Sequence, residues 1–353
     1  MTGHDGKSPQ TYLVTGGAGF LGINLVRFLL QRGHAVRSLD IAPFAYPEAE
    51  RVDLVTGDIR DPGVARMAVQ GVDTVIHCAA ALPLYAPDVI QSTDVEGTRI
   101  MLEASHAAGI QRFVHVSSTA VYGVPDHHPI LENDPVSGVG PYGKAKIEAE
   151  AVCADFRKLG MCVPVIRPKS FVGPERLGIF ELLYDFASQG RNFPVIGSGA
   201  NRYQLLDVED LCQAIYLCAT LAHERVDEVY NVGAAEFGTM RSDFQAVLDR
   251  AGHGKHIVGL PKAPAILTLR LLEALKLSPV YEWIYDTAAR DSYVSIDKIR
   301  DRLGFTPRFS NREALIRNFD WYVANRNRLK AAPGLTHRAP WKRGALRVAS
   351  YFF

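Results

Sequence analysis

The first thirty residues contain a glycine-rich segment that restricts what this chain can fold into. A buried strand is expected at residues 11–15, and it runs directly into Gly16-Gly-Ala-Gly-Phe-Leu-Gly22. Apolar residues then recur at helical spacing as far as Gly33, where a left-handed residue would end a helix. Glycines at 16, 19 and 22 let backbone amides approach a pyrophosphate at a helix N-terminus. The segment therefore predicts a strand, a tight turn and a helix that together bind a dinucleotide.

The next expected strand ends in an acidic residue. It covers residues 35–40, and Asp40 follows Gly22 by eighteen positions. A carboxylate at this place can accept hydrogen bonds from the ribose hydroxyls of adenosine. Ile41 comes next, where an arginine would have favoured a 2′-phosphate. The pattern favours NAD over NADP as the cofactor.

Strand-like and helical segments alternate along the first half of the chain. The strand-like runs are residues 11–15, 35–40, 52–56, 73–78, 112–117 and 162–166. This alternation predicts an α/β fold with a Rossmann-like, doubly wound parallel sheet. After Pro174, longer apolar helical stretches predict a smaller C-terminal substrate-binding lobe. We expect a flexible leader at 1–10, an NAD-binding domain at 11–174 to which some later segments return, a lobe at 175–330 that mainly binds substrate, and a basic amphipathic tail at 331–353.

Composition narrows the class of protein further. A chain of 353 residues with 47% apolar content can bury a large core, and a formal net charge of +1 gives no sign of nucleic-acid binding. The five cysteines form no C-x-x-C pair and no cluster with histidines at zinc spacing, so we expect no metal site. With no apolar signal core and no run as long as a membrane span, a cytoplasmic location is expected.

Tyr142 and Lys146 stand four residues apart in the string Pro141-Tyr-Gly-Lys-Ala-Lys146. On a helix, this spacing places both side chains on one face, one turn apart. A phenol with a pKa of about 10 is a poor base at neutral pH, but a nearby ammonium favours the phenolate. Tyr142 could then exchange a proton with a substrate hydroxyl. Taken alone, the pair is also typical of an amphipathic surface helix, although Tyr142 is the one tyrosine of 14 with a lysine at this offset.

Together these motifs resemble the extended short-chain dehydrogenase/reductase superfamily, which includes the NAD-dependent epimerase/dehydratase family. The resemblance runs from about residue 11 to about residue 325. It is carried by the glycine-rich loop, the YxxxK helix, and the segments Gly57-Asp-Ile59, His77-Cys-Ala-Ala80, Val116–Gly123 and Arg167-Pro168. We therefore expect a Rossmann-like fold and hydride transfer at a secondary alcohol or ketone.

The resemblance also implies roles for individual residues. Ser118 would orient the substrate oxygen, Tyr142 would act as general base or acid, and Lys146 would lower the tyrosine pKa and bind the nicotinamide ribose. Ser118 is favoured over Ser117 and Thr119 because it lies four residues before Tyr122. The implied cofactor-binding residues are Gly16, Gly19, Phe20, Leu21, Gly22, Asp40, Asp58, Ile59, Ala79, Ala80, Tyr142, Lys146 and Pro168. Helices near 95–108 and 143–158 would pair with a second subunit in a homodimer.

Departures from the superfamily pattern bear on the substrate. Sugar 4,6-dehydratases often carry an Asp-Glu pair where this chain has Thr119-Ala120, which argues against a dehydratase. Nucleotide-sugar epimerases commonly have asparagine in place of Ser170 and arginine in place of Tyr203, with Arg202 one position out of register. The candidate substrate-binding residues are Thr119, Lys169, Ser170, Arg176 and Arg202. The three cations could rebuild a diphosphate site, although each alone is typical of a solvated surface. The leading interpretation is a 4-epimerase-like enzyme that acts on a sugar nucleotide through a keto intermediate.

A second resemblance favours a lipid-like substrate. The segment Gly197-x-Gly-x-Asn201, followed by an apolar run into Val208-Glu-Asp210, is similar to the 3β-hydroxysteroid dehydrogenase branch and to related keto-acid reductases. An apolar helix expected at 264–275 agrees with this branch, in which such helices cover a hydrophobic site. Cations and bulky apolar residues alternate at 338–353, so this tail could make peripheral contact with a membrane or pack on the protein.

A non-catalytic NAD-binding regulator is a third interpretation. Such members of the superfamily often lose the catalytic tyrosine or lysine, whereas Ser118, Tyr142 and Lys146 are all present here. Asp94 stands where the superfamily usually has asparagine, and we expect this change to alter the polar network behind the serine.

Overall fold

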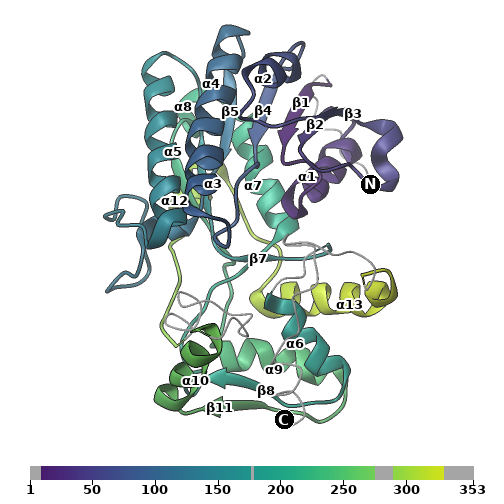
Figure 1. The fold of residues 1–353 in the computed structure, drawn as a ribbon, viewed down its shortest axis with the longest axis vertical. Helices are drawn as coiled ribbons and strands as arrows, with labels where there is room; N and C mark the ends of the chain where they lie inside the picture. The colour runs from purple at the N-terminus through teal and green to yellow at the C-terminus, as the bar shows by residue number, and fades with distance from the viewer. Residues whose placement is uncertain (1–8, 176–178, 275–288, 330–353) are drawn as a thin grey trace. The chain divides into compact units, whose positions relative to one another are not determined.

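The computed structural model describes residues 9–175, 179–274 and 289–329. Its main feature is a seven-stranded sheet with the strand order β10-β6-β5-β4-β1-β2-β3, in which every pair is parallel (Figure 1). The strands are β1 (Thr11–Thr15), β2 (Ala35–Asp40), β3 (Asp53–Thr56), β4 (Thr74–His77), β5 (Arg112–Val116), β6 (Val165–Pro168) and β10 (Val229–Val232). The order reverses at β1, as in a doubly wound Rossmann sheet, so the predicted fold class is confirmed.

The sheet differs from the expected strands mainly in two places. The run at 162–166 was placed too early: Cys162 makes only an isolated bridge to Arg112, and β6 begins at Val165. Pro164 lacks an N–H and contributes only its carbonyl, which accepts a 2.9 Å bond from the amide of His115. The seventh strand, β10, was not predicted.

Helices cover both faces of the sheet. On one face, α2 (Pro62–Ala68), α4 (Gly97–Ala107) and α5 (Gly140–Lys158) share a core with the strands (Figure 1). Buried members of this core include Leu39, Val75, Met101, Phe113 and Val152. On the other face, α1 (Phe20–Gln31) and α7 (Val208–Thr220) pack against each other and against the sheet. The short helices η1 (Pro47–Arg51) and α3 (Pro87–Gln91) lie in the connections.

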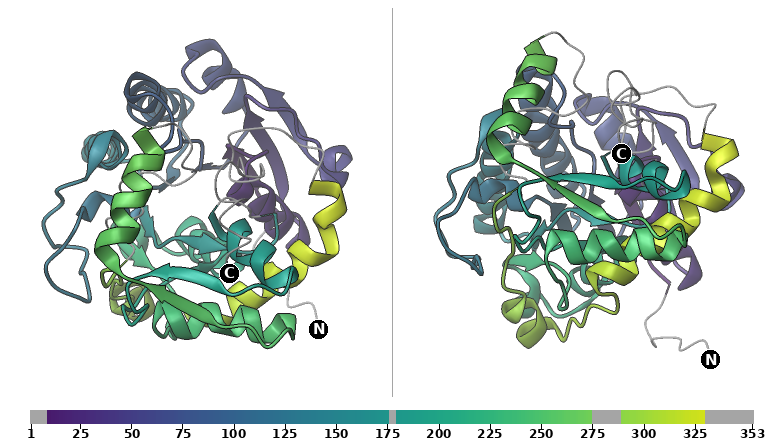
Figure 2. Two further views of the ribbon diagram at one scale, coloured as in Figure 1. Left: turned by 60° about the horizontal axis from the view of Figure 1, so that its bottom comes forward. Right: turned by 90° about the horizontal axis from the view of Figure 1, so that it is seen from below.

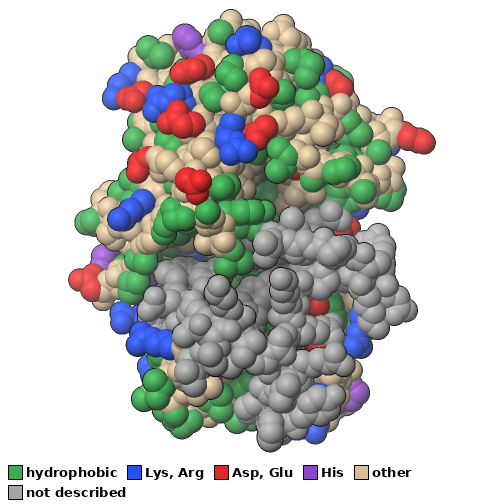
Figure 3. All heavy atoms as spheres, in the orientation of Figure 1, with side chains coloured by type: hydrophobic (Ala, Val, Ile, Leu, Met, Phe, Trp, Pro, Cys, Tyr) green, Lys and Arg blue, Asp and Glu red, His purple; other side chains and the backbone are tan. Residues whose placement is uncertain are grey.

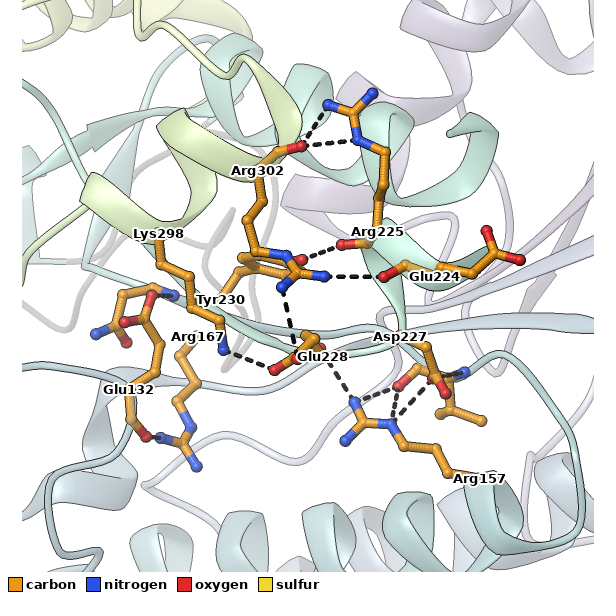
Figure 4. Close-up of polar contacts among 12 residues, drawn as sticks. Glu132, Arg157, Arg167, Glu224, Arg225, Asp227, Glu228, Tyr230, Lys298 and Arg302 are labelled. Carbon is orange, nitrogen blue, oxygen red and sulfur yellow. Dashed lines mark hydrogen bonds and ion pairs between the residues drawn. The ribbon is translucent and has the colours of Figure 1, made fainter. Parts of the chain in front are cut away.

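The edge strand β10 is held by polar contacts with α5 and α12 (Asp297–Leu303), as Figure 4 shows. Just before the strand, Asp227 accepts a 3.1 Å bond from Nε of Arg157 on α5, and Glu228 accepts a 2.8 Å bond from Nζ of Lys298 on α12. Arg302 of α12 donates to the carbonyl of Glu224, in α8 (His223–Val226). Segments far apart in the sequence thus fix this edge of the sheet.

The chain divides into two compact units. The first comprises Met1–Lys169, Val208–Val232 and Ser295–Thr306, and the second comprises Ser170–Asp207, Gly233–Val294 and Pro307–Phe353. The described elements of the second unit are β7 (Phe171–Val172), α6 (Ile179–Ser188), β8 (Phe193–Ile196), β9 (Leu206–Asp207), α9 (Met240–Ala251), β11 (Ile257–Leu260), α10 (Lys262–Ala274) and α13 (Asn311–Leu329). Its strands form two small parallel sheets, β7-β9 and β8-β11, and α6, α9 and α13 pack together around a shared apolar core (Figure 2).

The surface of the first unit carries mixed charge. On the face shown in Figure 3, its acidic and basic side chains are interspersed, which agrees with the net charge of +1. No helix in the described ranges combines the length and the apolar character needed to cross a bilayer. Most of the predicted leader, the tail at 331–353 and Arg176 lie outside the described residues.

Candidate active site

The glycine-rich loop between β1 and α1 leaves no space for a side chain at Gly16 or Gly22. Gly16 has a φ of +68°, and a Cβ there would lie 2.9 Å from the backbone of Ala79. A Cβ at Gly22 would lie 2.1 Å from the carbonyl oxygen of Gly16. Helix α1 begins after Gly19 with neither a capping side chain nor an acidic residue in its first turn, where Phe20, Leu21 and Gly22 stand. Its first amides therefore suit an anion, and the loop fits the pyrophosphate of a dinucleotide.

Asp40 lies at the end of β2, beside this loop. Its Oδ2 accepts a 3.0 Å bond from the amide of Ala18, and its Oδ1 accepts a 2.8 Å bond from the amide of Ala42. Burial raises the pKa of Asp40 above its ordinary value, although bonds from backbone amides oppose this shift. Two backbone amides thus fix the carboxylate beside the glycine-rich loop.

The residues expected around the adenine and along the cofactor lie in the same unit. Ile59 is buried beneath Gly97, where a Cβ would lie 2.6 Å from the Ile59 side chain. Asp58 pairs with Arg60 at 2.6 Å, and this hydrogen-bonded guanidinium lowers the pKa of Asp58. After β4, the amide of Ala79 donates a hydrogen bond to Thr15 Oγ1. The next residue, Ala80, is exposed. Pro168, at the end of β6, is buried.

Ser118 and Tyr142 lie on two elements that pack closely together. Ser118 begins the short helix η3 (Thr119–Tyr122), and its Oγ accepts a 3.1 Å bond from the amide of Ala120. Tyr142 lies in the first turn of α5, which packs on η3. Gly143, which sequence reasoning missed, permits this packing, because a Cβ there would lie 2.9 Å from the carbonyl oxygen of Ala120.

Lys146 follows Tyr142 by one turn and is fully buried. Its Nζ lies 5.7 Å from the centroid of the Tyr142 ring. Asp94, in the π-helical turn η2 (Ser92–Glu96), places Oδ2 3.5 Å from the same Nζ. Burial lowers the pKa of Lys146, but attraction to Asp94 and Tyr142 outweighs burial and leaves the pKa above its ordinary value. The lysine is therefore a cation beside the tyrosine, as a role in proton transfer requires.

A second buried ion pair lies one turn further along α5. Glu150 accepts bonds from Nη2 of Arg167 at 2.6 Å and from Nε at 2.9 Å, and it also accepts a 2.5 Å bond from the hydroxyl of Ser117. Arg167 also donates to the hydroxyl of Tyr122, which donates in turn to Asn231. Burial raises the pKa of Tyr122 to about 12. This network ties α5 to the ends of β5, β6 and β10 and was not predicted.

The candidate substrate residues belong to different parts of the chain. In the first unit, Thr119 donates its hydroxyl to the carbonyl of Pro168 at 3.3 Å. Lys169 is buried, contrary to the simpler expectation of a solvated charge, and burial lowers its pKa to about 7. In the second unit, Ser170 Oγ lies 3.2 Å from Tyr203 Oη, and Arg202 is an exposed residue.

Arg202 lies against two aromatic rings of the second unit, whose centroids are 5.4 Å apart. Its guanidinium carbon lies 4.7 Å from the ring centroid of Phe237 and 4.6 Å from that of Tyr293. Its backbone amide donates a 2.7 Å bond to Asp291. The cation is therefore held in a fixed place by aromatic rings and by the backbone.

Three possible metal ligands lie close together in the first unit, and the sequence did not predict this cluster. Ligand atoms of Cys162, His223 and Asp227 all lie within 4.8 Å of one another. Asp227, however, accepts bonds from Nε of Arg157 and from the amide of Val163. Burial also raises the pKa of the Cys162 thiol to about 11, so the thiolate that a metal needs is disfavoured. The grouping carries no metal assignment.

Comparisons with known proteins agree with this geometry. Residues 12–233 match the sequence model of the NAD-dependent epimerase/dehydratase family. The uncharacterised protein y4nG of Sinorhizobium fredii is 36% identical over 350 residues, which cover 98% of this chain and 87% of that protein. A 3β-hydroxysteroid dehydrogenase/Δ5→4-isomerase of Mycobacterium tuberculosis is 31% identical over 88% of this chain and 90% of its own.

A similar solved structure is that of DesIV, a dTDP-glucose 4,6-dehydratase of Streptomyces venezuelae crystallised with NAD. It superposes with a TM-score of 0.70 at 30% identity, over 90% of this chain and 98% of that one. The named relatives of this chain thus include enzymes of more than one reaction.

Proposed function

Because this chain belongs to the NAD-dependent epimerase/dehydratase family, we propose that it oxidises a secondary alcohol of a sugar nucleotide and reduces the ketone again, as a 4-epimerase does. The observation that carries this proposal is the pairing of Tyr142 with a buried, charged Lys146 one helical turn away. The closely packed loop before α1 and the carboxylate of Asp40 supply a place for NAD in the same unit. NAD, when bound, would supply the hydride acceptor at the nicotinamide.

The residues of the chain then have distinct roles. Tyr142 takes the proton of the substrate hydroxyl and returns it, because the adjacent ammonium favours the phenolate. Ser118 accepts one bond from the amide of Ala120, which leaves its own hydroxyl hydrogen available for the substrate oxygen. Both side chains belong to the first unit and lie on elements that pack together.

One observation favours an epimerase over a 4,6-dehydratase. Elimination of water needs a second acid and base near the sugar. At the corresponding places this chain has Thr119, whose hydroxyl is donated to Pro168, and Ala120, which has no ionisable group. Arg202 of the second unit lies against Phe237 and Tyr293 and offers a cation for a diphosphate, which supports a sugar nucleotide as the substrate of either reaction.

A second candidate is a dehydrogenase of a steroid-like or other lipid-like alcohol. Helix α10 supports it, because Leu267 is 70% exposed and Ile266 and Leu269 are half-buried. Tyr203 also stands where nucleotide-sugar epimerases commonly have arginine, and a relative named as a 3β-hydroxysteroid dehydrogenase is 31% identical. A third candidate is a regulator that binds NAD without turnover.

One experiment separates the three. Native mass spectrometry of fresh protein measures retained NAD, and NMR then follows UDP- and dTDP-hexoses that carry deuterium at C4. Inversion at C4 with the deuterium retained on the sugar supports the epimerase. NADH that accumulates from an apolar secondary alcohol supports the dehydrogenase, and NAD binding without either reaction supports the regulator. Failure to bind NAD contradicts all three.

We further propose that the chain is a homodimer formed through α4 and α5, as its superfamily resemblance implies. Light scattering of the eluting protein would test this. A mass of one chain at micromolar concentration contradicts it.

A further inference from the structure

A buried ion pair joins Asp94 on η2 to Lys146 on α5. The side chain of Asp94 is 0% exposed, that of Lys146 is 2% exposed, and Asp94 Oδ2 lies 3.5 Å from Nζ. Asp94 Oδ1 accepts a 2.6 Å bond from the amide of Ala81. Within the described residues, Oδ2 has no hydrogen-bond partner, so the lysine ammonium is what it faces. One carboxylate oxygen is fixed by the backbone and the other balances the buried cation.

The turn that carries Asp94 is shaped for this contact. Residues Ser92–Glu96 form a π-helical turn between α3 and α4, and α5 packs on it. Thr98 donates its hydroxyl to the carbonyl of Asp94 at 2.6 Å, which fixes the backbone there. A π-helical turn is uncommon and is often found at functional sites. Burying an ammonium without a counter-charge is costly, so the pair explains how Lys146 stays charged.

Several titratable groups surround the ammonium of Lys146. They are Tyr142 and Glu150 on α5, Asp94 on η2, His77 and Cys78 at the end of β4, and His115 on β5. Burial, aided by the charge of Lys146, lowers the pKa of His77 to about 3 and holds that of His115 far below its usual range. Burial raises the pKa of the Cys78 thiol to about 12. These three groups are therefore neutral at pH 7.

Glu150 does not supply the missing counter-charge. Its carboxylate is already paired with Arg167 through two hydrogen bonds, at 2.6 and 2.9 Å. Among the described residues, Asp94 is thus the carboxylate that balances Lys146. With Asp94 ionised, the Asp94–Lys146 pair carries no net charge, and with a neutral side chain in its place the site would carry one positive charge.

We propose that Asp94 is a positioning residue that balances Lys146 and thereby raises the pH range in which Tyr142 gives up its proton. This inference rests on the proposed function, because it takes Tyr142 as the group that transfers the proton. A site with net positive charge favours a phenolate more strongly than a neutral site does. The superfamily usually has an uncharged asparagine at this position, so the aspartate sets this chain apart from that pattern.

The test is a titration of Tyr142 itself, which needs no substrate. Protein labelled with ¹³C at tyrosine Cζ is titrated by NMR with and without NAD, and the signal that is missing from Tyr142→Phe identifies the residue. Asp94→Asn keeps an oxygen for the amide of Ala81 but removes the charge. We expect the first midpoint of the coupled Tyr142–Lys146 pair to fall by about one pH unit or more. Oδ2 of Asp94 lies no more than about 9 Å from the centre of the Tyr142 ring, because it is 3.5 Å from Nζ of Lys146 and Nζ is 5.7 Å from that centre. A unit charge about 9 Å away, at an effective dielectric constant near 20, changes a pKa by about one unit.

Matched variants show whether the charge is the cause. Asp94→Glu keeps the charge and is expected to keep the midpoint close to that of the wild type. Asp227→Asn removes a carboxylate that pairs with Arg157 on the same helix, about 16 Å along α5 from Lys146, and should leave the midpoint unchanged. If Asp94→Asn does not fold, Asp94→Ser supplies the neutral side chain.

The outcomes separate this inference from the proposed function. An unchanged or raised midpoint in the neutral variants overturns the role of Asp94, whatever the substrate is. Failure to bind NAD contradicts the proposed function, while the titration without NAD still decides the role of Asp94. Once a substrate is identified, the acidic limb of the pH profile of kcat should move to lower pH in Asp94→Asn, with the affinity for NAD little changed.

Discussion

Arg167 holds Glu150 with two N–H donors, at 2.6 and 2.9 Å, and their side chains are only 7% and 10% exposed. The pair lies where β6 ends and where α5 passes behind the candidate active site. Its partners include the hydroxyls of Ser117 and Tyr122, the neighbours on either side of the segment that presents Ser118. The contact therefore fixes the position of α5 relative to the ends of β5 and β6.

Breaking this pair should destabilise the fold strongly. Glu150→Ala leaves a buried guanidinium without its carboxylate, and we expect the free energy of unfolding to fall by roughly 3–5 kcal/mol. Urea denaturation followed by circular dichroism measures this. Arg250→Ala is the control: it breaks an exposed pair with Asp320 and should cost about 1 kcal/mol or less. Equal losses in the two variants would show that the buried pair has no special role.

Removing the hydroxyl of Tyr142 should lower turnover without weakening the binding of NAD. We expect Tyr142→Phe to lower turnover by about 10²–10⁴-fold, because the proton-transferring group is lost. The affinity for NAD, measured by calorimetry, should change little. Tyr122→Phe is the matched control: its hydroxyl joins Arg167 to Asn231 inside the fold, so stability should fall by about 1–3 kcal/mol. Substantial turnover in Tyr142→Phe would contradict the mechanism.

Gly143→Ala tests the close approach of α5 to η3. The new Cβ would lie 2.9 Å from the carbonyl oxygen of Ala120, so the helix and the segment with Ser118 must move apart. We expect turnover to fall at least about tenfold, because small displacements of catalytic groups are costly. Lys144→Ala changes an exposed position on the same helix and should keep turnover near that of the wild type. If both variants are fully active, the contact does not align the site.

Asp40→Ser should relax the choice of cofactor. In the predicted cofactor site, the carboxylate would accept bonds from ribose hydroxyls and repel a 2′-phosphate, and serine removes that charge. We expect the Kd for NAD to rise about 10–100-fold, the loss of about 1.4–2.8 kcal/mol of binding free energy, while the Kd for NADP falls. Protein fluorescence measures both constants. Asp53→Ser, which removes an exposed partner of Arg37 from β3, should change neither.

Two of the buried histidines, His77 and His115, should make the fold sensitive to acid. Burial lowers the pKa of His77 to about 3 and that of His115 well below its ordinary value, so the unfolded chain binds more protons than the folded chain below pH 6.5. Stability is therefore complete above pH 6.5 and falls on acidification, by about 1.4 kcal/mol per pH unit for each histidine.

A leucine in place of His115 isolates one of these contributions. Within the described residues, neither ring nitrogen of His115 has a hydrogen-bond partner, so His115→Leu should cost little at pH 7. Comparing urea denaturation at pH 7 and pH 5, we expect the variant to lose less stability than the wild type. An equal loss in both proteins would mean that His115 contributes nothing to the acid sensitivity.

Local patterns predicted the part of the fold that is built from neighbours in sequence. The loop from Gly16 to Gly22 and the strands β1 and β2 lie where they were expected, because glycine spacing and apolar runs act over short distances. β10 was missed because it has four residues and reaches the sheet only after the chain has passed through α6 and α7. No local sequence pattern indicates that the chain returns to the sheet at β10.

Because sequence patterns act over short distances, they also predicted only part of the candidate site. The spacing of Tyr142 and Lys146 is a property of one helix, so it could be read directly. The partner of Lys146 lies 52 residues away on a π-helical turn. The change from the usual asparagine marked Asp94 as a departure, but it pointed to the serine network, whereas the structure places the carboxylate beside the lysine. Roles in binding stay predictions.

The first unit is assembled from three separate stretches of the chain, and this affects how the protein is made. A nascent chain that has emerged only as far as Lys169 presents β6 as an open sheet edge, because β10 comes more than fifty residues later. Such an edge can pair with any other strand that is available. Synthesis must therefore pass Val232 before β10 can cover the edge of β6, and fragments that stop at the first stretch should aggregate.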